Sequence, residues 1–136
     1  MSDTLTGSCL CGTVQFSVRG GFDVFHLCHC SRCRKGTGSA HASNLFTKAD
    51  KLTIERGESS MQRWDHPDAR YFSRCFCTHC GGPVPYVSRR GPIAVIPAGT
   101  LEGDPGIEPR DNIFWQDRAC WYEAVAGAPR FDADPV

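Results

Sequence analysis

Nine cysteines in a chain of 136 residues constrain this protein more than any other feature of its sequence. The first residues carry neither the basic nor the apolar stretch of a signal peptide, so we expect the protein to be cytoplasmic, where thiols stay reduced. Clustered cysteines in a reducing compartment are typical of metal sites, and an odd number argues against a closed disulfide framework. Eight of the nine fall into three short-spaced groups: Cys9 and Cys11; Cys28, Cys30 and Cys33 (the cysteine triplet); and Cys75, Cys77 and Cys80.

The spacing within these groups indicates which cysteines can share an ion. In an extended segment residues i and i+2 point to the same side, so Cys9 and Cys11 can bind one ion together. Cys77 and Cys80 belong to a Cys-x-x-Cys-Gly-Gly pattern typical of a zinc knuckle, in which the glycines allow a tight turn. Joined, the two pairs would form one closed four-thiolate site that ties distant parts of the chain together, so that metal binding stabilises the fold. The triplet would then keep an open fourth position.

A second pairing is consistent with the same spacings. Cys75 could close the cysteine triplet, and the protein would then have no open metal position. Spacing alone does not decide between the two arrangements. For Cys75 we favour a buried thiol without a metal, and for Cys120, beside Trp121, we expect a place in the core, because free cysteine behaves as a small apolar residue.

The charge balance argues against two classes of partner. Lys+Arg and Asp+Glu both number 15, which gives a formal net charge of zero and no overall positive field for nucleic acid. No apolar run approaches the roughly 20 residues that cross a bilayer. We therefore expect neither nucleic acid nor a membrane as partner. The length suits a single domain, residues 1–136, of which residues 126–136 are expected to form a loosely ordered tail.

Short β-prone runs separated by glycine and proline predict a mainly β fold. Residues 13–18 alternate strictly between apolar and polar side chains, as in a half-buried strand. Ser31 can cap a single helical turn at residues 31–34, which Gly36 would end. Further strands are expected at residues 24–27, 41–46, 52–55, 61–64, 70–74, 84–87, 93–96 and 112–115.

Three motifs occur in a specific order along the chain. They are Gly7-Ser8-Cys9-Leu10-Cys11-Gly12-Thr13-Val14-Gln15-Phe16, Cys28-His29-Cys30-Ser31-Arg32-Cys33-Arg34-Lys35 and Phe76-Cys77-Thr78-His79-Cys80-Gly81. In these motifs the sequence resembles the glutathione-dependent formaldehyde-activating family, and the late segment Asn112-Ile113-Phe114 with Trp121 is similar to that family's closing strand. The resemblance covers nearly the whole chain. It implies a tent-like, zinc-stapled domain of small antiparallel sheets, the Mss4-like fold.

The resemblance also implies two zinc ions per chain and an activity. Cys9, Cys11, Cys77 and Cys80 would hold a structural zinc, and the cysteine triplet would hold a second, catalytic one. The implied enzyme is a carbon–sulfur lyase or synthase that joins glutathione to formaldehyde, or cleaves such an adduct. An open zinc with three thiolates can hold a small thiol in its deprotonated form, and a thiolate is the nucleophile that adds to an aldehyde.

Two alternatives to this function remain open at the level of sequence. The same open zinc site could act on a different thiol or on another carbon–sulfur conjugate. The protein could instead be a non-catalytic zinc-stapled binding module, with the second site closed by Cys75 or another group. Iron also accepts thiolate ligands, so the sequence does not fix the metal.

Glutathione carries two carboxylates, so a cleft that binds it should present basic side chains. Arg34 and Lys35 directly follow the triplet, and Arg89 and Arg90 follow the knuckle. A solvated surface charge is the alternative for each of the four. His41 could line the same cleft, or it could be an ordinary strand histidine. The sequence identifies no general base.

Overall fold

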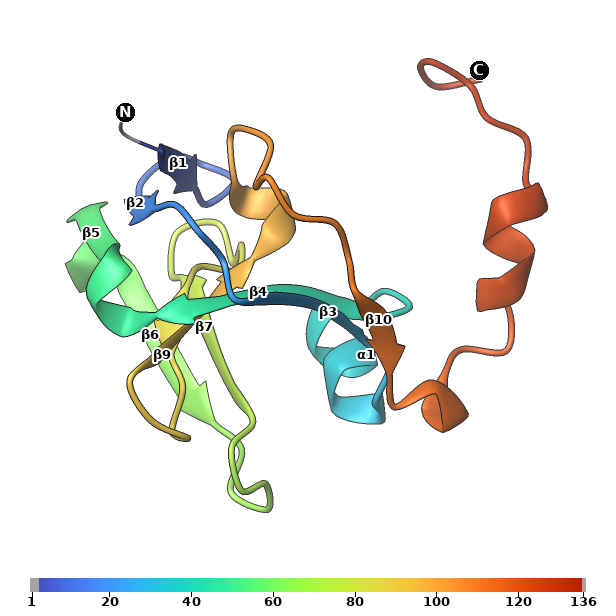
Figure 1. Cartoon of the computed structure of the whole chain (residues 1–136), viewed down its shortest axis with the longest axis horizontal. Coiled ribbons are helices and arrows are strands. Elements are labelled where there is room, and N and C mark those ends of the chain that lie inside the picture. Colours follow the sequence, from blue (N-terminus) through green and yellow to red (C-terminus); the bar gives the residue numbers. More distant parts are fainter. Residues whose placement is uncertain (1–2, 136) are drawn as a thin grey trace.

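The fold is built from small β-sheets, as a computed structural model covering residues 3–135 shows (Figure 1). Within this range the sheets have the strand orders β1-β2-β5, β10-β3-β4-β9-β8 and β6-β7. Neighbouring strands are antiparallel except β10, which runs parallel to β3. The expected mainly β fold of small antiparallel sheets is confirmed. The strands are β1 Thr4–Ser8, β2 Gln15–Arg19, β3 Val24–Cys28, β4 Ala42–Lys48, β5 Leu52–Arg56, β6 Met61–Asp65, β7 Ser73–Cys77, β8 Tyr86–Val87, β9 Ile93–Pro97 and β10 Asp111–Ile113.

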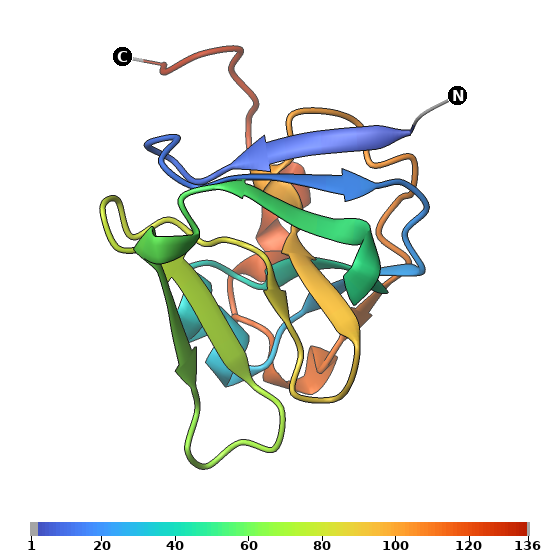
Figure 2. The same cartoon turned by 90° about the vertical axis from the view of Figure 1, so that its left-hand side faces the viewer.

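The main core lies between the β1-β2-β5 sheet and the five-stranded sheet, which Figure 2 shows one above the other. The alternation predicted for residues 13–18 buries Val14, Phe16 and Val18 to 1% exposure or less. The ring of Phe16 lies so close to β1 that a Cβ on Gly7 would approach its Cζ atom to 2.3 Å. Burial of a side chain such as Phe16 contributes about 1.5–3 kcal/mol.

Helix α1, Ser31–Thr37, is longer than the single turn expected from the sequence. Its N-cap is Cys30 rather than Ser31, because the Cys30 sulfur accepts a hydrogen bond from the Cys33 backbone N–H at 3.4 Å. The helix continues through Gly36, where the Cδ atom of Arg74 would lie 3.2 Å from an added Cβ. It ends instead at Gly38, which has the left-handed conformation (φ 71°) common after a helix.

Three segments differ from the expected strands. β1 was not expected; it forms an edge of its sheet by pairing with β2. The strand expected at residues 70–74 lies at Ser73–Cys77, with its first, third and fifth side chains buried, so two cysteines follow the strand alternation. β10 ends at Ile113 because Phe114 adopts a left-handed conformation with φ 54°.

Short 3₁₀ turns connect several strands and follow the last one. They are η1 Ala49–Lys51, η2 Glu58–Ser60, η3 Ala98–Thr100, η4 Trp115–Asp117 and η5 Tyr122–Gly127. In Figure 1 η5 stands apart from the sheets at the C-terminal side. None of the helices in residues 3–135 has the length and apolar character needed to span a bilayer.

Candidate metal centres and the cavity beside them

Four cysteines from distant parts of the chain meet in one cluster. The sulfur atoms of Cys9, Cys11, Cys77 and Cys80 all lie within 4.8 Å of one another. The Cys9–Cys11 and Cys11–Cys77 sulfur distances are 3.7 and 3.9 Å. Four sulfurs at about 2.3 Å from a central zinc, in a tetrahedron, would be separated by about 3.8 Å. The spacing and the all-thiolate donor set therefore fit a zinc ion.

Turns on both sides of this four-cysteine cluster aim backbone N–H groups at the sulfurs. Val14 N–H donates to Cys9 at 3.3 Å, and Gly82 N–H donates to Cys80 at 3.4 Å. Hydrogen bonds from backbone N–H groups, first that of Cys11, lower the pKa of Cys80 to about 6. Such bonds favour the thiolate form, which is the form that binds metal. The glycine expected to allow the knuckle turn, Gly81, has φ 74°.

The cysteine triplet is formed where β3 passes into α1. Cys28 is the last residue of β3, Cys30 caps the helix, and Cys33 lies in its first turn. Their sulfurs also lie within 4.8 Å of one another. A hydrogen bond from the Cys33 thiol is the main cause that lowers the pKa of Cys28 to about 6, and the same bond raises the pKa of Cys33. The donor set fits zinc with three protein ligands.

No fourth ligand completes the triplet within residues 3–135. Cys75 belongs to neither set of clustered ligand atoms; its side chain is 7% exposed and packs in the apolar cluster with Cys9 and Cys77. Burial raises the pKa of the Cys75 thiol. The placement expected for Cys120 is wrong: the residue is exposed, because the segment that carries it leaves the sheets.

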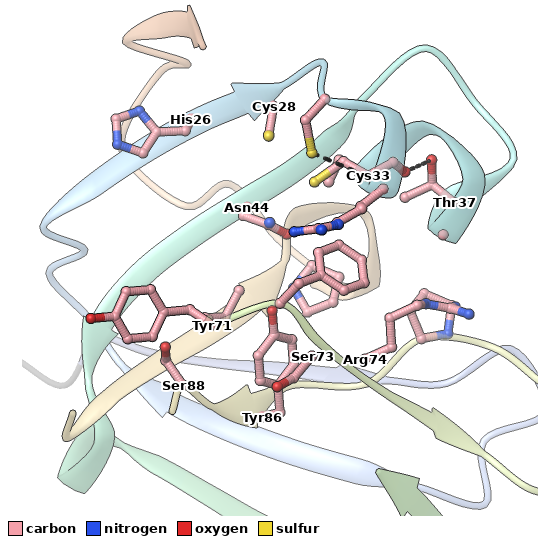
Figure 3. A pocket seen from close by; sticks show the side chains of 18 of the residues that line it. His26, Cys28, Cys33, Thr37, Asn44, Tyr71, Ser73, Arg74, Tyr86 and Ser88 are labelled. Carbon is pink, nitrogen blue, oxygen red and sulfur yellow. Dashed lines mark hydrogen bonds between the residues drawn. The ribbon is translucent and has the colours of Figure 1, made fainter. Parts of the chain in front are cut away.

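A cavity of about 900 Å³ adjoins the triplet. Its walls come from α1, β3 and β4 on one side and from β7, β8 and the loops around them on the other (Figure 3). Cys28 and Cys33 appear at one end of this space in Figure 3, with Tyr71, Ser88 and Tyr86 at the other. The volume is typical of a small-molecule site. The basic side chains that line the cavity are Arg32, Arg74 and Arg90.

Of the residues that the sequence suggested as substrate contacts, only Arg90 lines the cavity. Arg34, Lys35 and His41 do not contribute to the walls of this cavity. Lys35 is exposed on α1, whereas the Nε atom of Arg34 is buried without a hydrogen-bond partner. Arg89 donates to three backbone carbonyls of the loop between β6 and β7, and so holds that loop. Arg90 does line the cavity, and its guanidinium lies 4.6 Å from the ring centre of Tyr71.

His41 instead belongs to a cluster of aromatic rings that includes His29, which lies between Cys28 and Cys30 in the sequence. Its ring lies 5.1 Å from that of His29 and 5.5 Å from that of Tyr122, and Trp115 packs on His29 as well. His29 is fully buried, and its Nε2 atom lies 2.9 Å from Asn112 Oδ1. Burial lowers the pKa of His41.

The structure also places a His–Asp pair that sequence reasoning missed. His26 lines the cavity, and its Nδ1 atom lies 2.5 Å from Asp111 Oδ1. The His26 hydrogen bond lowers the pKa of the Asp111 carboxyl. The two residues are 85 positions apart and meet because β10 pairs in parallel with β3, in the register Asp111↔His26. No local pattern in the sequence indicates that pairing.

Fold and site together define a small β protein with two cysteine clusters that could hold metal ions. The profile of the family described as "Glutathione-dependent formaldehyde-activating enzyme" matches residues 4–117, and the chain belongs to this family. A Halomonas elongata protein named for the same family is 30% identical over 129 residues, which cover 88% of this chain and 80% of that protein. The crystal structure of a Rhodobacter sphaeroides protein has the same fold, with a TM-score of 0.61 and 24% identity over 79% of this chain and 98% of that one.

Proposed function

We propose that the protein is a zinc-dependent carbon–sulfur lyase or synthase that joins glutathione to formaldehyde, or cleaves the adduct. The observation that carries the proposal is the position of the cysteine triplet, whose three sulfurs gather at a cavity without a fourth ligand from residues 3–135. Membership of the formaldehyde-activating family supports the choice of thiol and aldehyde. In this proposal the triplet holds a catalytic zinc, and the four-cysteine cluster holds a structural one.

The reaction requires a thiolate beside an aldehyde. Cys28, Cys30 and Cys33 would hold zinc with a fourth position open, and zinc in that place would stabilise a substrate thiol in its deprotonated form. The thiolate sulfur forms a bond to the carbonyl carbon, the carbonyl π electrons move to oxygen, and that oxygen takes up the proton that the thiol released. The product is an S-hydroxymethyl thiol. Cleavage of such an adduct reverses each of these steps.

Side chains of the cavity can bind the carboxylates of glutathione and the oxygen of the aldehyde. Arg32, Arg74 and Arg90 can pair with the two carboxylates of glutathione, since guanidinium–carboxylate hydrogen bonds are among the strongest in proteins. Arg90 is held against the ring of Tyr71, so less side-chain freedom is lost on binding. Asp111 accepts a hydrogen bond from His26 Nδ1 and fixes the ring at the cavity wall, where Nε2 of the protonated ring can donate to the carbonyl oxygen of the aldehyde.

Metal content and turnover, measured on wild type and Cys30→Ser, test the proposal. Wild type should hold two zinc ions per chain and consume formaldehyde faster than the spontaneous reaction, with a rate that depends on glutathione concentration. Cys30→Ser should keep its far-UV circular dichroism, lose one zinc and lose turnover. A single zinc in wild type, or a folded Cys30→Ser protein with unchanged turnover, would contradict the open-site mechanism. Two zinc ions without glutathione-dependent turnover would point to another thiol or to a binding module.

Arginine substitutions in the cavity test where the carboxylates bind. Arg74→Gln should raise the KM for glutathione about tenfold and leave KM for formaldehyde nearly unchanged, because one charge-assisted hydrogen bond is worth about 1.5–3 kcal/mol. Lys35→Gln is the matched control, since Lys35 is a basic residue on α1 that does not line the cavity. Equal effects of the two substitutions on KM would rule out a specific role of Arg74.

A further inference from the structure

The C-terminal arm, residues 120–135, is an exposed segment that lies outside the part of the chain matched by the family profile. Every residue of the arm is exposed except Tyr122, which is half-buried. In Figure 1 the arm extends away from the sheets, beyond η4. The arm therefore presents most of its surface to the outside.

Tyr122 packs the start of the arm against the body. Its ring centre lies 4.8 Å from that of the fully buried His29 and 5.9 Å from that of Trp115. An ion pair between Arg118 and Glu123, 2.8 Å apart, ties the start of η5 to the preceding turn. These contacts give the first part of the arm a defined direction from the body.

Large apolar side chains are concentrated on and beside the arm. Trp121, Val125 and Phe131 are 54%, 54% and 64% exposed. Phe114 and Trp115, just before the arm, are 57% and 38% exposed. Aromatic residues are enriched in the buried centres of protein interfaces, whereas a monomeric protein rarely exposes such a group of them together.

The exposed area of the whole chain is larger than the average for a monomer of this mass. It amounts to 8694 Å² for 15.0 kDa. Monomeric proteins of this mass expose about 7,000 Å², so about 1,600 Å² is in excess. Standard interfaces bury about 800 Å² per partner, and permanent homodimers bury about 1,000–2,500 Å² per partner. The excess therefore matches one side of a permanent homodimer interface.

We propose that this chain forms a homodimer. The C-terminal arm of each copy packs against the other copy, so that the two arms together form the interface. A permanently exposed apolar surface needs a partner that is present in equal amount from synthesis onward, and a second copy meets this condition. A two-fold interface uses the same surface on both copies, so each copy contributes its own arm to the interface. The net charge of zero means that two copies do not repel each other.

Sedimentation velocity of the zinc-loaded full chain, over about 1–100 µM, tests the proposal, because dimer formation follows mass action. Wild type should sediment with twice the 15.0 kDa mass of one chain. The variant Val125→Asp/Phe131→Asp should sediment as a monomer with unchanged far-UV circular dichroism, because both side chains are exposed. Val87→Asp, which alters an apolar side chain 41% exposed on β8, is the matched control and should stay dimeric.

Hydrogen exchange gives a second measurement. The amides of residues 120–135 should exchange more slowly in wild type than in Val125→Asp/Phe131→Asp, while those of β6 should not differ between the two proteins. A wild type that is monomeric throughout would overturn the proposal and leave the arm for a different partner. An oligomer that persists in Val125→Asp/Phe131→Asp, or arm amides that exchange equally fast in wild type and in this variant, would also overturn it.

Discussion

Serine replacements of Cys9 and Cys28 should differ in their effect on stability, because the two clusters close loops of different length. The four-cysteine cluster joins residues as far apart as Cys11 and Cys77, which are 66 positions apart. The triplet spans only residues 28–33. With the loop-closure relation used for crosslinks, the long loop corresponds to about 4 kcal/mol of lost unfolded-state entropy and the short one to about 2 kcal/mol.

The two positions form a matched pair. Cys9 and Cys28 are 3% and 8% exposed, and each lies beside a β-strand end, so the cost of burying a serine hydroxyl should be similar. The difference between the variants therefore isolates the proposed metal crosslink. Because a domain is stable by only about 5–15 kcal/mol, Cys9→Ser should be marginally stable, whereas Cys28→Ser should remain folded.

Urea unfolding followed by far-UV circular dichroism measures the difference. Each protein is unfolded in reducing buffer with zinc at the concentration that fills both sites of wild type. We expect the free energy of unfolding of Cys9→Ser to lie about 2 kcal/mol or more below that of Cys28→Ser. Equal losses, or a larger loss for Cys28→Ser, would refute the assignment of the four-cysteine cluster as the long-range structural clip.

Three further predictions concern backbone geometry and thiol ionisation. Gly57→Ala should lower the free energy of unfolding by about 1–3 kcal/mol in urea denaturation, because φ is +80° and the added Cβ would lie 2.2 Å from a backbone oxygen. Gly99→Ala is the control: an added Cβ there has no neighbour within 4 Å, so the free energy of unfolding should change by less than about 0.5 kcal/mol. Phe114→Gly should alter thermal stability little, because relief of about 1–2 kcal/mol of left-handed strain offsets the greater freedom of the unfolded glycine; a large loss would mean that the exposed ring makes stabilising contacts. In metal-free protein, alkylation of Cys28 should rise with a midpoint near pH 6, because the Cys33 hydrogen bond lowers its pKa to about 6. As this folded pKa lies below the unfolded value of about 8.5, the stabilisation is complete above that value and is lost as the pH falls through 6. Cys33→Ala should move the alkylation midpoint upward, and an unchanged midpoint would contradict the hydrogen-bond explanation.

Much of the fold followed from short-range patterns. The alternation in residues 13–18 identified the buried face of β2, and the spacing of the knuckle cysteines identified a turn that holds two sulfurs on one side. Such features depend on residues a few positions apart, which the sequence displays directly. Cysteine-rich segments were harder to predict. The strand at Ser73–Cys77 was expected at residues 70–74, because its cysteines were interpreted as ligands and not as members of an alternating strand. The helix α1 was predicted to end too early, because Gly36 was interpreted as a helix stop, whereas it allows Arg74 to approach the helix closely.

Local patterns were enough to establish the mainly β fold, the family and the three short-spaced cysteine groups. Spacing left open how those groups combine, and the folded chain shows that Cys75 packs in a different apolar cluster and lies outside the triplet's set of ligand atoms. The folded chain also decided which basic residues face the cavity, with Arg32, Arg74 and Arg90 in its walls and Arg34 and Lys35 outside them. It joined His26 to Asp111 through a parallel strand pair. The physical reason is that strand register and the direction of a side chain from a short helix arise from packing between distant segments, which no local pattern encodes.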